Sequence, residues 1–175
     1  RWVRVEPGVI LEALNKGTEQ HVLFFGPETS TSSRCMIGGM VGNNSCGAHS
    51  IIYGSTRDHT LGVKGFLSDG SPVEFSELTV REFEEKCNGD RPESKLYRQI
   101  REMLSDTCNQ EQIRQGYPDP AIHRRNTGYA LDLLLDSEPF AEPENQNRPL
   151  PGFNFAKLIA GSEGTLMFIT EIKLN

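Results

Sequence analysis

The first part of the chain alternates between strand-like and helix-like patterns. Residues 2–5 (WVRV) predict a strand, and apolar positions at helical spacing over residues 9–14 predict a helix of about two turns that ends near Gly17. The apolar run at residues 22–25 (VLFF) predicts a second short strand. The chain therefore opens with a strand, a helix and another strand.

A β-hairpin is predicted after this unit. Residues 61–67 alternate as a strand does, residues 72–75 form a second strand-like run, and the dipeptide at 69–70 (DG) is a strong turn former. Hairpins of this kind are mostly scaffold, so we assign it no chemistry.

Two helices are expected after the hairpin. Thr79 and Glu82 have the spacing of a capping box, which predicts a short helix that runs to about Cys87. A second helix is predicted from about Ser94, because apolar residues repeat there at positions i, i+4 and i+8. The two helices are expected to cover a sheet face. The apolar residues of the second helix are expected to lie in the core: Leu96, Tyr97, Ile100, Met103 and Leu104.

The C-terminal part combines an irregular segment with a final strand. Residues 137–152 are rich in Pro, Asn and Glu, which predicts an exposed loop. Residues 153–159 predict a short helix, residues 161–164 (GSEG) a turn, and residues 166–174 a closing strand. The pattern thus indicates strands interleaved with helices and leaves the strand order open.

A glycine-rich stretch at residues 36–59 carries the candidate chemistry. Glycine lets a backbone approach a ligand closely and lets several N–H groups point inward, so a loop of this composition suits a phosphate. The spacing matches neither the Gly-x-Gly-x-x-Gly fingerprint nor the Gly-Lys-Ser/Thr phosphate loop. A loop that needs glycine only for tight turns fits the composition equally well. The residues concerned are Gly38, Gly39, Gly42, Gly47 and Gly54, with Asn43 and Asn44.

Length and charge narrow the class of protein. The chain has 175 residues, enough for one domain with a core, and a net charge of −6. Its 18 Lys and Arg residues are scattered, which argues against nucleic-acid binding. No apolar run approaches the roughly 20 residues that cross a bilayer, and no signal peptide is visible, so a cytoplasmic location is the default expectation.

Two of the four cysteines lie close in sequence to two histidines. The cysteines show no Cys-x-x-Cys pair, and the spacing of Cys35, Cys46, His49 and His59 is not that of usual zinc ligands. We therefore predict no metal and expect these side chains to be buried or to lie in loops.

Three stretches of the chain resemble the FAD-linked oxidase family and occur in the family's order. The first comprises residues 25–33 and 37–47, the second residues 53–63 with 69–70, and the third residues 157–171. The family is of the vanillyl-alcohol oxidase type with a PCMH-type FAD-binding domain, and it includes D-lactate dehydrogenase, glycolate oxidase and D-2-hydroxyglutarate dehydrogenase. The resemblance implies an α+β fold, with a mixed, largely antiparallel sheet flanked by helices.

The resemblance also implies FAD as the cofactor of a flavin-dependent oxidoreductase. The implied reaction dehydrogenates a 2-hydroxy acid: a hydride or its equivalent passes to flavin N5 while a base takes the hydroxyl proton. The pyrophosphate and ribityl chain are expected near residues 38–47, and the isoalloxazine or adenosine near residues 53–54, 164 and 169. The expected cofactor contacts are Pro27, Ser30, Thr31, Ile37, Gly38, Gly39, Asn43, Asn44, Gly47, Tyr53, Gly54, Glu163, Gly164 and Ile169.

Parts of the family pattern are missing or altered. Family members usually begin with another subdomain whose Arg-Gly-Gly-Gly-Thr-type loop clasps the pyrophosphate, and no such string occurs here. The length leaves no room for a C-terminal substrate cap either. The resemblance therefore implies that residues 1–175 form one domain, the second FAD subdomain. Its partners are then the missing subdomains of the parent chain. By itself this domain is expected to bind FAD weakly or not at all. Met167 stands where the family usually has glycine.

Catalytic residues are not assigned. The family's substrate base and arginine lie largely in the cap, so His49 and His59 are expected to make structural hydrogen bonds. Arg124 and Arg125 fit either contact with an anion, FAD phosphate or substrate, or a solvated or salt-bridged pair. Two other functions stay open: the FAD domain of a different flavoenzyme, such as a cell-wall precursor reductase or an aldonolactone oxidase, and a non-enzymatic interaction module.

Overall fold

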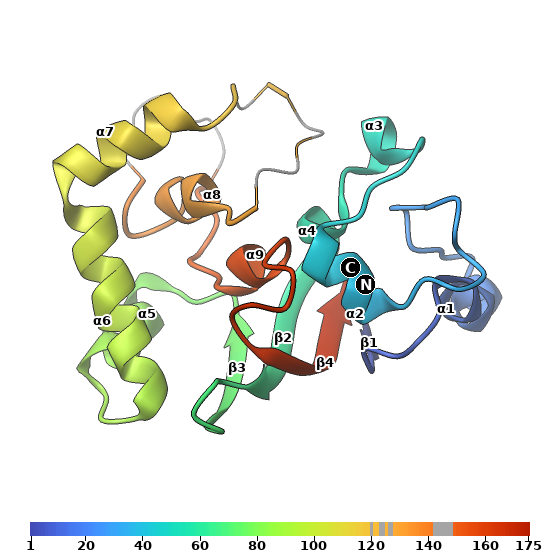
Figure 1. Cartoon of the computed structure of the whole chain (residues 1–175), viewed down its shortest axis with the longest axis horizontal. Coiled ribbons are helices and arrows are strands. Elements are labelled where there is room, and N and C mark those ends of the chain that lie inside the picture. Colours follow the sequence, from blue (N-terminus) through green and yellow to red (C-terminus); the bar gives the residue numbers. More distant parts are fainter. Residues whose placement is uncertain (120, 123–124, 126–127, 142–148) are drawn as a thin grey trace.

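The computed structural model describes residues 1–119, 121–122, 125, 128–141 and 149–175. Most of the helices lie above a four-stranded sheet, and α1 lies beside it (Figure 1). The elements in chain order are β1 (Val3–Val5), α1 (Leu11–Thr18), the 3-10 helix η1 (Glu19–His21), α2 (Ile37–Asn43), α3 (Ser50–Tyr53), α4 (Thr56–His59), β2 (Thr60–Phe66), β3 (Pro72–Ser76), α5 (Val80–Asn88), α6 (Pro92–Ser105), α7 (Thr107–Gly116), α8 (Leu131–Leu135), α9 (Ala156–Ile159) and β4 (Phe168–Leu174).

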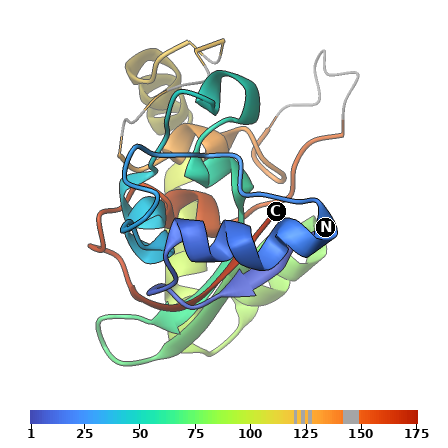
Figure 2. The same ribbon diagram turned by 90° about the vertical axis from the view of Figure 1, so that its right-hand side faces the viewer.

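The sheet has the strand order β1-β4-β2-β3, and its described strands pair antiparallel throughout. Val63 of β2 lies opposite both Phe75 of β3 and Ile172 of β4, so β2 and β4 form the centre. Because Val3 pairs with Leu174, the first and last strands are neighbours and the two termini lie close together (Figure 2). The α+β fold with a largely antiparallel sheet is confirmed.

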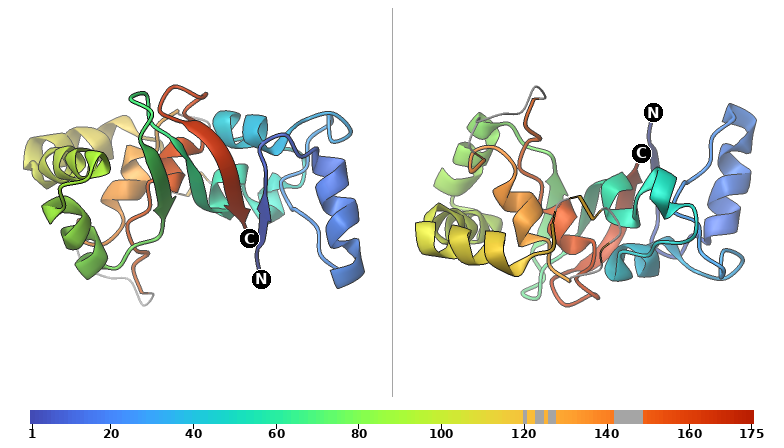
Figure 3. Two further views of the ribbon diagram at one scale, coloured as in Figure 1. Left: turned by 90° about the horizontal axis from the view of Figure 1, so that it is seen from below. Right: turned by 90° about the horizontal axis from the view of Figure 1, so that it is seen from above.

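The two faces of the sheet differ in polarity. Val63, Phe75 and Ile172 are at most 2% exposed and face the helices, whereas the opposite face is open to solvent (Figure 3). Residues that alternate with them along the strands carry charges of both signs, since neighbouring side chains of a strand point to opposite faces. Lys64 Nζ lies 3.1 Å from a Glu171 carboxylate oxygen on that open face.

Helices α5 and α6 cover the buried face at the β3 end of the sheet, as predicted. Phe83 of α5 and Tyr97 of α6 meet Phe153 and Phe155, with ring centroids 4.7 Å apart for Phe83–Phe153 and 4.9 Å for Tyr97–Phe155. Phe75 of β3 joins this aromatic cluster, with its ring centroid 5.1 Å from that of Phe155. The predicted hairpin and the capping box that begins α5 are also confirmed.

The strand expected at residues 22–25 is wrong. Val22 has left-handed backbone geometry (φ 56°) and is 92% exposed. The amide of Phe25 donates to Asn15 Oδ1 at 2.8 Å, so its hydrogen bond goes to a helix side chain and not to a strand. An apolar run alone cannot distinguish a strand from a segment that turns around a helix end.

The glycine-rich stretch is also not the single loop that its composition suggested. Residues 37–43 form α2, and α3 and α4 follow within the same stretch. Close packing requires glycine at position 38 of α2, because a Cβ on Gly38 would lie 2.7 Å from Pro7 Cβ. Helix α7 was not predicted, because Ile113 is the single buried residue of its sequence.

None of the helices within the described ranges is both long and apolar enough to cross a membrane.

Candidate functional site

Helix α2 and the turn at residues 161–164 are joined by backbone hydrogen bonds. The Gly161 amide donates to Val41 O at 2.9 Å, and the Glu163 amide donates to Gly42 O at 2.9 Å. A Cβ on Gly42 would lie 3.8 Å from Glu163 Cα and from Gly164 N. The first and third stretches that resemble the FAD-linked oxidases therefore meet in space at this junction.

This junction leaves two glycines open at the surface. A Cβ on Gly39 or Gly164 would have no neighbour within 4 Å, and both residues are exposed. The amides of Ile37 and Gly38, at the start of α2, are already bound to Val9 O and Pro7 O at 2.9 and 2.8 Å. In the described part of the chain, no hydrogen-bond acceptor is found for the Gly39 amide, and the residue is exposed.

The donor set of this surface fits a dinucleotide such as FAD. Open backbone amides can donate to phosphate or ring oxygens, and glycine keeps a side chain from standing between backbone and ligand. Asn43 is exposed at the end of α2 and offers both donor and acceptor groups. Glu163 is exposed and left-handed (φ 53°), and its carboxylate suits a ribityl or ribose hydroxyl better than a phosphate.

A second group of expected contacts lies where residues 26–31 cross residues 46–54. A Cβ on Gly47 would collide with Glu28 O, and one on Gly26 would lie 2.7 Å from Tyr53 Cβ. The crossing encloses a pocket of about 440 Å³ lined by residues 28–30 and 46–49, which include Ser30 and Gly47. Of the other expected contacts here, Pro27 is buried, Thr31 is half-buried, Tyr53 is 40% exposed, and Gly54 has a φ of 79°.

Three expected contacts have side chains that serve the fold itself. Ile37 is fully buried in the core, and Ile169 lies in β4 opposite Gly65. Asn44 is 1% exposed; its Oδ1 accepts from Arg57 N at 2.8 Å and its Nδ2 donates to Arg125 O at 3.4 Å. Their cofactor contacts stay predictions that concern backbone atoms.

The histidines near the glycine-rich stretch make structural contacts, as expected. His59 Nε2 lies 2.6 Å from Tyr53 O, and His49 Nδ1 lies 2.7 Å from Glu28 Oε2. Among the residues that the structure describes, no group of three or more His, Cys, Asp or Glu side chains could hold a metal ion. Arg125 forms an ion pair with Asp132, and Arg124 lies outside the described residues.

Arg57 is the residue of this region that the sequence analysis overlooked. It is 2% exposed, and its guanidinium donates to the carbonyls of Ala160 and Gly128. Burial lowers the pKa of Arg57, and the Asp132 carboxylate offsets part of that effect. The capping box formed by Ser55 and Asp58 is the sequence signal that could have placed Arg57 in the first turn of a helix.

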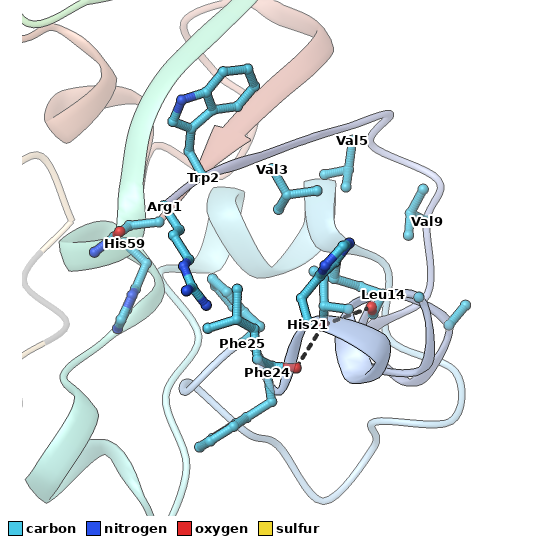
Figure 4. Close-up of a pocket in the computed structure, with 15 residues that line it drawn as sticks. Arg1, Trp2, Val3, Val5, Val9, Leu14, His21, Phe24, Phe25 and His59 are labelled. Atoms are coloured by element: carbon cyan, nitrogen blue, oxygen red, sulfur yellow. Dashed lines mark hydrogen bonds between the residues drawn. The ribbon is translucent and has the colours of Figure 1, made fainter.

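A separate pocket of about 840 Å³ lies between β1, α1 and residues 21–25 (Figure 4). Its wall is mainly apolar, with Val3, Val5 and Leu14 on one side and Phe24 and Phe25 on another. None of the expected cofactor contacts lines it, so its size does not make it the candidate site.

Comparison with known proteins gives relatives along the whole chain. Residues 1–76 match the FAD binding domain family. The D-2-hydroxyglutarate dehydrogenase of Escherichia coli K12 is 35% identical over 176 residues, which are 99% of this chain and 16% of that protein. That of Haemophilus influenzae is 34% identical, over 100% of this chain and 16% of its own length. The glycolate oxidase subunit GlcD of E. coli K12 is 36% identical over 42% of this chain and 15% of its own length.

The chain thus spans about 16% of the length of the D-2-hydroxyglutarate dehydrogenases that it matches. FAD, the cofactor expected from the sequence, is the cofactor of the matched family. The three motif stretches, the junction of two of them in space and these relatives agree in their similarity to the FAD-linked oxidase family.

Proposed function

We propose that this chain forms one wall of the FAD site of an oxidoreductase that dehydrogenates a 2-hydroxy acid of the D-2-hydroxyglutarate type. The substrate class comes from the names of the relatives that match the entire chain, whereas the glycolate oxidase subunits match less than half of it. The observation that carries the proposal is the junction of α2 with residues 161–164, where Gly39 and Gly164 are both exposed and each has open space where a Cβ would stand.

The chain's own part in the reaction is to bind and orient. When bound, FAD supplies the acceptor for the hydrogen and electrons that leave the substrate alcohol. The Gly39 amide in the first turn of α2 and Asn43 at its C-terminal end offer hydrogen bonds, and Glu163 offers a carboxylate to a sugar hydroxyl. Other parts of a longer protein complete the site and hold the substrate, and residues 1–175 act beside them as one domain.

Titration with cofactor fragments tests this assignment even if affinity is low. Amide chemical shifts of the ¹⁵N-labelled chain are followed while FAD, ADP or FMN is added to millimolar concentration. We expect dose-dependent shifts at Gly39, Asn43 and Gly164. ADP and FMN show which half of the cofactor each group contacts. If these amides do not move, or only those lining the pocket beside α1 do, the proposed wall is wrong.

A matched pair of glycine substitutions separates binding from stability. Gly39→Ala and Gly17→Ala each place a methyl group in open space on a helix, and each should stabilise its helix by up to about 1 kcal/mol. Gly39→Ala is expected to weaken the FAD-dependent shifts several-fold because its methyl group stands between backbone and ligand. Gly17→Ala should leave them unchanged, and equal effects of the two would argue against the site.

A further inference from the structure

We propose that Arg57 is a positioning residue for the cofactor wall, holding the end of α2 and residues 161–164 in register. This inference rests on the proposed function. Neither the family match nor the names of the relatives assign Arg57 a role, and the residue does not reach the open surface itself because it is 2% exposed. Its effect on a ligand therefore acts through the segments that it binds.

Arg57, in α4, connects three other segments of the chain: the end of α2, α9 with its C-cap, and Gly128. Its backbone amide donates to Asn44 Oδ1 at 2.8 Å, at the C-terminal end of α2. Its backbone carbonyl accepts from Lys157 Nζ at 2.9 Å. Its guanidinium Nε donates to Ala160 O at 2.9 Å, and the same side chain donates to Gly128 O at 2.6 Å. The residue therefore lies between both halves of the wall.

The choice of partners explains why a cation can be buried here. Ala160 is the C-cap of α9, where helix carbonyls lack intrahelical partners and favour a positive charge. The planar guanidinium reaches two carbonyls that point from different segments, which the single ammonium group of lysine does less well. The charged groups around it are Asp132 and Asp58, which raise its pKa, Arg125, which lowers it, and Lys157, whose ammonium donates to the Arg57 carbonyl.

Gly161 leaves room for the Arg57 guanidinium because it has no side chain. It follows Ala160, has a φ of 94°, and an added Cβ would collide with the Arg57 guanidinium. The amide of Gly161 donates to Val41 O. The residue that packs against Arg57 therefore also forms the first hydrogen bond of the junction with α2. Arg57 on one side and α2 on the other fix the turn that carries Gly164.

Amide hydrogen exchange tests the inference without a bound cofactor. In Arg57→Ala, we expect the Gly161 and Glu163 amides to exchange about tenfold faster, while amides of β2 and β4 keep their protection. Added ethylguanidinium at non-denaturing concentration should restore protection, and Arg57→Lys should lie between wild type and Arg57→Ala. Arg101→Ala, which removes a 2.8 Å ion pair with Glu84 on the far helices, is the control and should leave both amides unchanged.

The outcomes separate this inference from the proposed function. Unchanged exchange at Gly161 and Glu163, or equal acceleration of all amides, would overturn the positioning role, because the second result describes general destabilisation. If Arg57→Ala shows the selective change and the FAD-dependent shifts weaken with it, the role is supported. If wild type shows no such shifts, the proposed function fails whatever the exchange data show. Equal FAD shifts in wild type and Arg57→Ala would overturn the positioning role alone.

A thermal double-mutant cycle gives a second test if Arg57→Ala folds poorly. Gly161→Ala suffers from its positive φ, from the collision with Arg57 and from a 2.9 Å approach to Gly128 O. In an Arg57→Lys background part of that collision is relieved, so Gly161→Ala should lower Tm by several degrees less than it does in wild type. Strictly additive Tm changes would show that Arg57 and Gly161 are not energetically coupled and would overturn the inference.

Discussion

At the scale of single residues, this chain needs glycine for two physical reasons: close approach of another segment, or a positive φ. A Cβ on Gly65 would collide with Phe168 O across the β2–β4 pair, whereas Gly70 has open space but a φ of 82°. We expect Gly65→Ala to lower the free energy of unfolding by about 3 kcal/mol through overpacking, and Gly70→Ala by about 1 kcal/mol through backbone strain. Urea denaturation measures both. A larger loss for Gly70→Ala would mean that strain, and not the close approach of strands, dominates.

At the scale of elements, the α5 capping box makes stability depend on pH. Hydrogen bonds from the Thr79 amide and then from its hydroxyl lower the pKa of Glu82 below its unfolded value. Their contribution is therefore present above the unfolded pKa and is lost as pH falls through the folded pKa. Thr79→Ala should cost about 1 kcal/mol at pH 7 and less at pH 3. Melting curves at both pH values measure this, with Thr107→Ala as a non-capping control that should show no such difference.

At the scale of elements, the sequence predicts those that depend on local properties and misses those that depend on distant contacts. The hairpin, α5 and α6 were predicted because their turn, cap and apolar period are local properties of the chain. The misassigned elements depend on distant partners: α2 carries three glycines, and the need for glycine at position 38 becomes apparent only beside Pro7. Arg57 escaped for the same reason, since its carbonyl partners lie 71 and 103 positions away. The motif resemblance located the junction, and the structure explained it.

At the scale of the whole molecule, one buried cluster runs from Leu11 to Leu174 and includes residues of α2, the sheet and the far helices. A shared core predicts that residues 1–175 unfold as one cooperative unit. The single tryptophan, Trp2, lies at the β1 edge with the Arg4 and Lys173 cations 5.2 and 5.0 Å from its ring centroid, so its fluorescence reports that edge. Far-UV circular dichroism reports the helices, the longest of which lie at the opposite end (Figure 1).

Phe153→Ala tests this cooperativity from the end remote from Trp2. Phe153 is fully buried in the aromatic cluster, so its removal should cost about 3–5 kcal/mol, whereas Phe168→Ala, at a residue 72% exposed, should cost less than about 1 kcal/mol. We expect Phe153→Ala to lower the urea midpoint seen by fluorescence and by circular dichroism equally. If the dichroism midpoint falls while the fluorescence midpoint stays, the helices at that end form a separate unit. The stability of the cofactor wall would then depend only on the part of the molecule that contains α2, because α2 and residues 161–164 meet there.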